Sequence, residues 1–124
     1  MVTNQVADSL YTILSGIHAR VYRNAPPANP TFPYVVFNAE SITDTYPSDD
    51  YYLYVDVFDS ASSSISVRTM EVIADSIYAI GRTVVNNTNL TMQIERISRQ
   101  FVSADDLTTS KMITMQFSCR VYFK

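Results

Sequence analysis

The stretch YYLYVDVFD, residues 51 to 59, constrains the fold more than any other part of the sequence. Successive side chains of a β-strand point to opposite sides of its sheet, so both faces of this strand can be read from the sequence. One face would be aliphatic, with Leu53, Val55 and Val57. The other would be aromatic around Asp56, with Tyr52, Tyr54 and Phe58. Neither face suits water, so the strand needs covering on both sides.

Two amphipathic helices are predicted to supply part of that covering. Residues 3 to 18 place apolar side chains at spacings of three and four, which form one stripe on a helix: Val6, Leu10, Ile13, Leu14 and Ile17. Thr3 or Asn4 would be the N-cap of this helix. Residues 64 to 84 show the same one-sided spacing, with Met70, Ile73, Ile77, Ile80 and Val84.

Three further strands are predicted from alternating side chains. Residues 34 to 42 form a hairpin with the strand at 51 to 59, and residues 90 to 102 and 111 to 123 form a long C-terminal hairpin. In the first strand of the second hairpin, Leu90, Met92 and Ile94 share a face that Ile97 and Phe101 do not, which predicts a β-bulge or a strong twist near Glu95 and Arg96. The loop at the far end of this hairpin is expected to project from the body.

These elements predict a single α+β domain spanning residues 1 to 124. It has an antiparallel sheet of about four strands, two helices packed on one face and a long C-terminal β-hairpin. Two helices cover only one side of such a sheet. The aromatic side would then be covered either by the chain itself, for which the proline-rich residues 24 to 33 are available, or by another protein chain.

The second alternative makes the aromatic face a subunit interface, because tyrosine offers a large rigid surface with a polar tip. The candidate interface residues are Tyr52, Tyr54, Phe58, Tyr34, Val36 and Tyr122.

Composition argues against several other functions. The chain has 9 basic and 12 acidic residues, a net charge of −3, and no basic run, which disfavours direct binding to nucleic acid. The N-terminus lacks the features of a signal peptide, so we expect the encoded chain to be the mature chain. No stretch approaches the roughly 20 apolar residues of a membrane span.

The sequence supplies few groups for catalysis, and we predict that the protein is not an enzyme. His18, the only histidine, is expected to have a structural role at the end of the first helix. Cys119 would point into the core, where its thiol is unreactive. With only two glycines there is no phosphate-binding loop, and the acidic pairs at 49–50 and 105–106 lack the spacing of a calcium loop. No cofactor and no metal are predicted.

The order of elements and several short phrases are similar to a known family. The phrases FPYVVFN and YLYVDVFD, a serine-rich entry into an amphipathic helix, and a closing hairpin that ends in FSCRVYFK resemble the tail terminator or tail completion proteins of long-tailed bacteriophages. The resemblance runs from about Val6 to Phe123 and involves no catalytic motif.

The resemblance implies a structural virion protein that forms a homohexameric ring. Such a ring caps the tail tube, stops its polymerisation and joins the tail to the head connector, with a channel through which DNA passes without specific binding. The implied partners are sister copies, the major tail tube protein and the connector or neck protein, in the virion and in the host cytoplasm during assembly. Candidates for the channel lining or docking loops are Asp49, Asp50, Asp105 and Asp106. Two alternatives stay open: another phage neck or tail adaptor, and a small-ligand-binding α+β domain.

Overall fold

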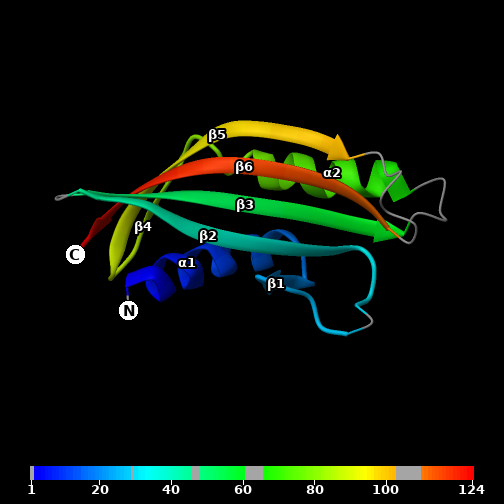
Figure 1. The fold of residues 1–124 in the computed structure, drawn as a ribbon, viewed down its shortest axis with the longest axis horizontal. Helices are drawn as coiled ribbons and strands as arrows, with labels where there is room; N and C mark the ends of the chain where they lie inside the picture. The colour runs from blue at the N-terminus through cyan, green and yellow to red at the C-terminus, as the bar shows by residue number, and fades with distance from the viewer. Residues whose placement is uncertain (1, 29, 46–47, 61–65, 103–109) are drawn as a thin grey trace.

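The protein is a curved six-stranded sheet with two helices on one side (Figure 1). The computed structural model describes all residues except 1, 29, 46–47, 61–65 and 103–109. The elements in chain order are α1 (Val2–Ile17), β1 (Val21–Arg23), β2 (Tyr34–Thr45), β3 (Ser48–Ser60), α2 (Ser66–Tyr78), β4 (Thr83–Asn86), β5 (Leu90–Val102) and β6 (Ser110–Phe123).

The strand order in the sheet is β1-β2-β3-β6-β5-β4. The four central strands are antiparallel neighbours, as predicted for the two hairpins. The predicted α+β class is confirmed, but the prediction of four strands was wrong, because β1 and β4 add a short strand at each edge. With 3 and 4 residues, these edge strands are too short to show the alternation from which strands are read.

The second helix is shorter than predicted. It ends at Tyr78, and residues 79–82 form a turn in which Arg82 has a φ of 76°. This left-handed conformation cannot continue a helix. Val84 therefore lies in β4, where its side chain is 62% exposed, and does not extend the apolar stripe of α2.

The first helix begins one residue earlier than predicted. Because α1 starts at Val2, the proposed N-caps Thr3 and Asn4 lie inside the helix. The side-chain oxygen of Asn4 instead accepts a hydrogen bond from Arg23 Nη1 at 3.0 Å, which ties α1 to the end of β1.

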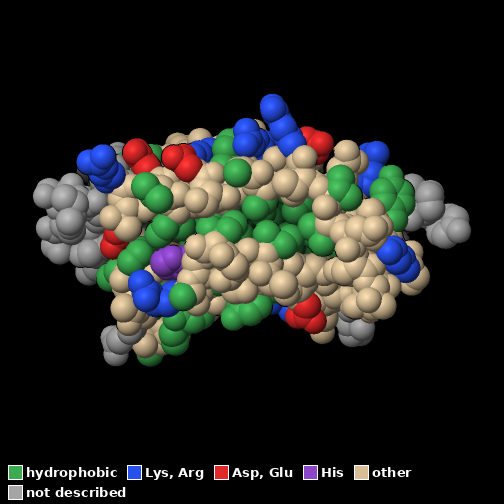
Figure 2. Space-filling view, turned by 180° about the vertical axis from the view of Figure 1, so that it is seen from behind, with side chains coloured by type: hydrophobic (Ala, Val, Ile, Leu, Met, Phe, Trp, Pro, Cys, Tyr) green, Lys and Arg blue, Asp and Glu red, His purple; other side chains and the backbone are tan. Residues whose placement is uncertain are grey.

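Both helices pack on the same face of the sheet, and the core lies between the two layers (Figure 1). Leu10 and Leu14 from α1, Ile77 from α2 and Leu53 from β3 are completely buried there. Figure 2 shows this helical face from behind, with hydrophobic side chains gathered along its middle. Among the described residues, no helix is long and apolar enough to cross a membrane.

Of the two irregularities predicted for the C-terminal hairpin, the structure shows the bulge. The pairing of β5 with β6 shifts between Arg96 and Ser98. The extra residue, Ile97, restores Phe101 to the helical side of the sheet, where it lies opposite the buried Ile113. The predicted projection of the hairpin loop lies outside the described residues.

Candidate assembly surface

The side of the sheet that faces away from the helices is called the open face here. In Figure 1 this face is nearest the viewer, and no described helix or strand crosses it. The residues predicted to point to this side do so, because they alternate along β2, β3 and β6 with residues buried in the core. Val36, Tyr52, Tyr54 and Phe58 are half-buried on the open face, and Tyr122 is 39% exposed.

One end of the open face is covered by the chain's own aromatic rings. The ring of Tyr34 stacks on Phe58 with centroids 5.0 Å apart, and it also contacts Tyr22 at 6.3 Å and Phe32 at 5.5 Å. Tyr34 is only 7% exposed, and burial raises the pKa of its hydroxyl. Phe32 comes from the proline-rich segment, so here the chain covers itself, and Tyr34 offers little surface to a partner.

Two basic side chains hold this segment in place. His18 Nε2 and Arg20 Nε each lie 2.9 Å from the carbonyl oxygen of Pro33. An imidazole N–H and a guanidinium N–H both donate to that oxygen. His18 thus links the segment after α1 to the entry of β2 through the Pro33 carbonyl.

The centre of the open face holds a tyrosine pair beside a carboxyl group. Tyr52 and Tyr54 meet edge to face with their ring centroids 6.1 Å apart. Asp56, next along β3, is half-buried, and its burial raises the pKa of its carboxyl group, an effect opposed by a hydrogen bond from Thr114. An acidic group that is already partly desolvated would lose more water if another chain covered it.

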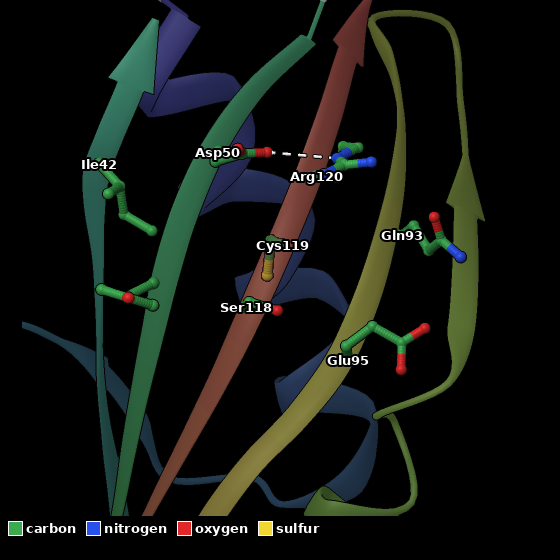
Figure 3. A pocket seen from close by; sticks show the side chains of 8 residues that line it. Ile42, Asp50, Gln93, Glu95, Ser118, Cys119 and Arg120 are labelled. Atoms are coloured by element: carbon green, nitrogen blue, oxygen red, sulfur yellow. Dashed lines mark hydrogen bonds and ion pairs between the residues drawn. The ribbon is translucent and has the colours of Figure 1, made fainter. Parts of the chain in front are cut away.

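The far end of the open face has a shallow depression of about 440 Å³. Figure 3 shows side chains from β2, β3, β5 and β6 around it. Its polar lining includes Gln93, Glu95, Ser118 and the ion pair between Asp50 and Arg120, whose oxygen and nitrogen are 3.4 Å apart. Of these polar residues, the sequence analysis named only Asp50 as a candidate for a channel or docking role, although the alternation along β6 already places Ser118 and Arg120 on this side.

The one cysteine of the chain lies beneath the depression and is buried. Cys119 lies at its base, but its side chain is 1% exposed and burial raises the pKa of its thiol to about 12. This agrees with the predicted inward orientation and low reactivity. In the described part of the chain, no group of three or more His, Cys, Asp and Glu residues is placed to hold a metal ion.

Of the four acidic candidates for channel or docking roles, the two that the structure describes lie on opposite sides of β3. Asp50 pairs with Arg120 and faces the open side. Asp49 lies opposite the buried Val121 and so belongs to the helical side of β3. Asp105 and Asp106 lie outside the described residues.

Comparisons with known proteins show a shared fold without a shared sequence. No family model and no curated protein matches the chain. One solved structure, a chain known by a sequence label alone, superposes with a TM-score of 0.72 at 14% identity, over 98% of this chain and 96% of that one. A chain from a structure described as the virion of a native gene transfer agent (GTA) particle superposes with a TM-score of 0.63 at 16% identity, over 94% and 91% of the two chains.

Proposed function

We propose that this protein is a structural component of a phage-like virion, and that its copies assemble into a ring. The observation that carries the proposal is the open face, a sheet surface bearing half-buried aromatic side chains that two helices leave uncovered. A face of this kind is typical of a contact surface in an assembly. The fold shared with a chain of the gene transfer agent virion supports the same reading.

Within this class, we propose that the ring is a homohexamer that ends the tail tube. It would cap the tube, stop its polymerisation and join the tail to the head connector. The partners are sister copies, the major tail tube protein and the connector protein, and the protein would be found in the virion and, during assembly, in the host cytoplasm. The net charge of −3 fits a channel wall that lets DNA pass without gripping it.

Native mass spectrometry, with and without tail tubes, tests the ring. We expect a hexamer alone, or a monomer that becomes a ring when tail tubes are present. Tubes made with the protein should stop at a defined length in electron micrographs, and tubes made without it should continue to grow. A ring that binds the neck but leaves tube length unchanged would identify another neck or tail adaptor.

A small-ligand-binding domain is the alternative from another class. It would use the depression beside Tyr52, which has room for a small molecule but is open and partly polar. A persistent monomer that retains a bound small molecule in native mass spectrometry would support this alternative and contradict the ring.

A charge on the open face tests its role in assembly. Tyr54→Asp should abolish the assembly contacts that are made through the open face, because an unpaired charge buried in a contact costs roughly 3–5 kcal/mol. Val72→Asp is the matched control, since Val72 is 62% exposed on α2, on the opposite side of the sheet. Circular dichroism reports the fold of both variants. If Tyr54→Asp loses its fold as well as its assembly, the face belongs to the packing of the single chain and is not a contact surface.

A further inference from the structure

Both edges of the sheet are open over part of their length. β1 pairs with β2 only at residues 35–37, and β4 pairs with β5 only at residues 91–94. Residues 38–45 of β2 and 95–102 of β5 therefore have no neighbouring strand on their outer side in the described chain. The two open stretches have the same length. Unpaired backbone groups along a strand edge are a template for pairing with another chain.

The open stretches also carry exposed hydrophobic side chains. Ile42 on β2 is 42% exposed, and Ile97 and Phe101 on β5 are 47% and 41% exposed. Natural edge strands are usually protected by charges or proline where they face water. Both open stretches also carry charges, Glu40 and Asp44 on β2 and Glu95, Arg96 and Arg99 on β5, but the large apolar side chains among them favour edges that become covered.

We propose that the open stretch of β5 in one copy pairs with the open stretch of β2 in the next copy. This inference rests on the proposed ring and names the surfaces that join it. Within one sheet, β2 and β5 run in opposite directions, because β2–β3, β3–β6 and β6–β5 are all antiparallel. Rotation about a ring axis keeps that relation between neighbouring copies. The junction would thus be an antiparallel pair, which continues the pattern of the sheet.

The register that overlaps the two stretches fully also matches their faces. It sets residue 38 opposite residue 102 and residue 45 opposite residue 95. Ala39 then meets Phe101, and both belong to the helical side because their partners within the sheet, Leu53 and Ile113, are buried. Glu40 then meets Gln100, one residue further along each strand, on the open face. A shift by one residue would place opposite faces together.

The irregularities of the two strands coincide as well. β2 has a register shift between Ser41 and Thr43, and β5 has one between Arg96 and Ser98. In the full-overlap register the extra residues, Ile42 and Ile97, become neighbours across the junction. Their exposed side chains would cover each other, so both bulges would lie in the same contact.

The edge strands do not obstruct this junction. In the same register β4, which covers residues 91–94 of β5, lies beyond the end of β2 at residue 45. β1, which covers residues 35–37 of β2, lies beyond the end of β5 at residue 102. The junction offsets neighbouring copies along the strands, as strands of a closed sheet must be when they tilt relative to its axis.

Paired cysteines test the junction directly. In the double variant Glu40→Cys/Gln100→Cys, the two Cα atoms of a junction would be about 4.5–5.5 Å apart, which suits a disulfide. Both residues are exposed in the single chain. The buried Cys119 should not interfere, being 1% exposed. Under mild oxidation we expect a ladder of covalent oligomers from the double variant and none from either single variant.

The single variants distinguish this junction from a symmetric one. Pairing of β2 with β2, or of β5 with β5, would give covalent dimers from a single variant, and that result would overturn the proposal. A double variant that stays monomeric under oxidation would overturn it too. If the parent protein still forms rings in native mass spectrometry, that failure concerns only the junction, and the proposed function stands.

A charge at the bulge gives an independent measurement. Ile97→Lys should lower the fraction of oligomer in native mass spectrometry at least tenfold, because it places a lysine in a contact between two isoleucines. Val84→Lys is the matched control, since Val84 is exposed on β4 outside the open stretches. Equal assembly by the two lysine variants, with both folded, would contradict the pairing.

Discussion

The Arg96 side chain, next to the bulge of β5, occupies the space that a side chain at Gly81 would need. A Cβ atom at this position would lie 2.2 Å from Cγ of Arg96, far inside van der Waals contact. The backbone of Gly81 does not have a positive φ, so alanine would fit the local conformation. The glycine is therefore needed because Arg96 lies so close to it, and not because of an unusual backbone conformation. Gly81→Ala should displace the Arg96 side chain.

The cost of that displacement follows from the contacts of Arg96. Its Nε donates a hydrogen bond to the carbonyl oxygen of Tyr78 at 2.8 Å, and its guanidinium carbon lies 4.6 Å from the centre of the Tyr78 ring. Losing the bond costs about 1 kcal/mol and losing the cation–π contact about 0.5–1 kcal/mol at an exposed site. Alanine returns about 0.4–1 kcal/mol by reducing the entropy of the unfolded chain. We expect a net loss of about 1 kcal/mol.

A double-mutant cycle in urea identifies the cause. In an Arg96→Ala background the clash is absent, so Gly81→Ala should become stabilising by about 0.5 kcal/mol. The coupling free energy between the two sites would then be about 1.5 kcal/mol. If Gly81→Ala changes the free energy of unfolding equally in both backgrounds, the contact with Arg96 is not what requires the glycine.

Three further outcomes are expected. Asp56 has a raised pKa in the folded protein, so its ionised form lowers stability above that pKa, and this loss disappears as the pH falls toward the ordinary value of 3.8. Asp56→Asn should therefore stabilise the protein near neutral pH in urea titrations, with a gain that shrinks toward acid pH, and a gain independent of pH would contradict the assignment. Arg82, with a φ of 76°, should accept glycine with little change or a gain of up to about 1 kcal/mol, whereas valine should cost more than about 1 kcal/mol, and equal melting temperatures for the two would refute this. Cys119 should react with iodoacetamide at about pH 8 only after unfolding, as its exposure and its thiol pKa of about 12 require, and rapid native labelling followed by mass spectrometry would show an open core.

The central strands could be predicted because long segments of alternating apolar and polar residues fit few structures other than a β-strand. β5 begins and ends where the sequence predicted, and even its bulge was visible, since Ile97 and Phe101 broke a phase set by three preceding residues. The short edge strands could not be predicted in this way. Three or four residues such as those of β1 and β4 acquire strand geometry from the neighbour with which they pair.

The end of α2 depends on the left-handed backbone conformation of Arg82, which the apolar spacing of the sequence does not indicate. Ile80 is buried and keeps the helical spacing, yet the chain has already turned, and the left-handed Arg82 directs it into β4. Gly81 is a residue type that often follows a helix end, but the apolar spacing continues through Ile80 and Val84, and arginine is uncommon in the left-handed conformation that Arg82 adopts. The same limit applies to the open edges, which depend on where β1 and β4 stop.

The two proposed contact surfaces use different parts of the same sheet. Edge pairing between β2 and β5 would engage backbone groups and the three exposed residues Ile42, Ile97 and Phe101, and would leave Tyr52 and Tyr54 on the open face untouched. A contact of this kind joins unlike surfaces of identical chains, so it must either close into a ring or continue as a filament. In a closed ring every open face would lie on the same side of the wall, in register around the axis. Six repeated aromatic surfaces are then available to one concentric or stacked partner, and such a repeat would favour a partner with the same symmetry. Ile97→Lys should therefore prevent ring closure, whereas Tyr54→Asp should act on contacts that the closed ring makes.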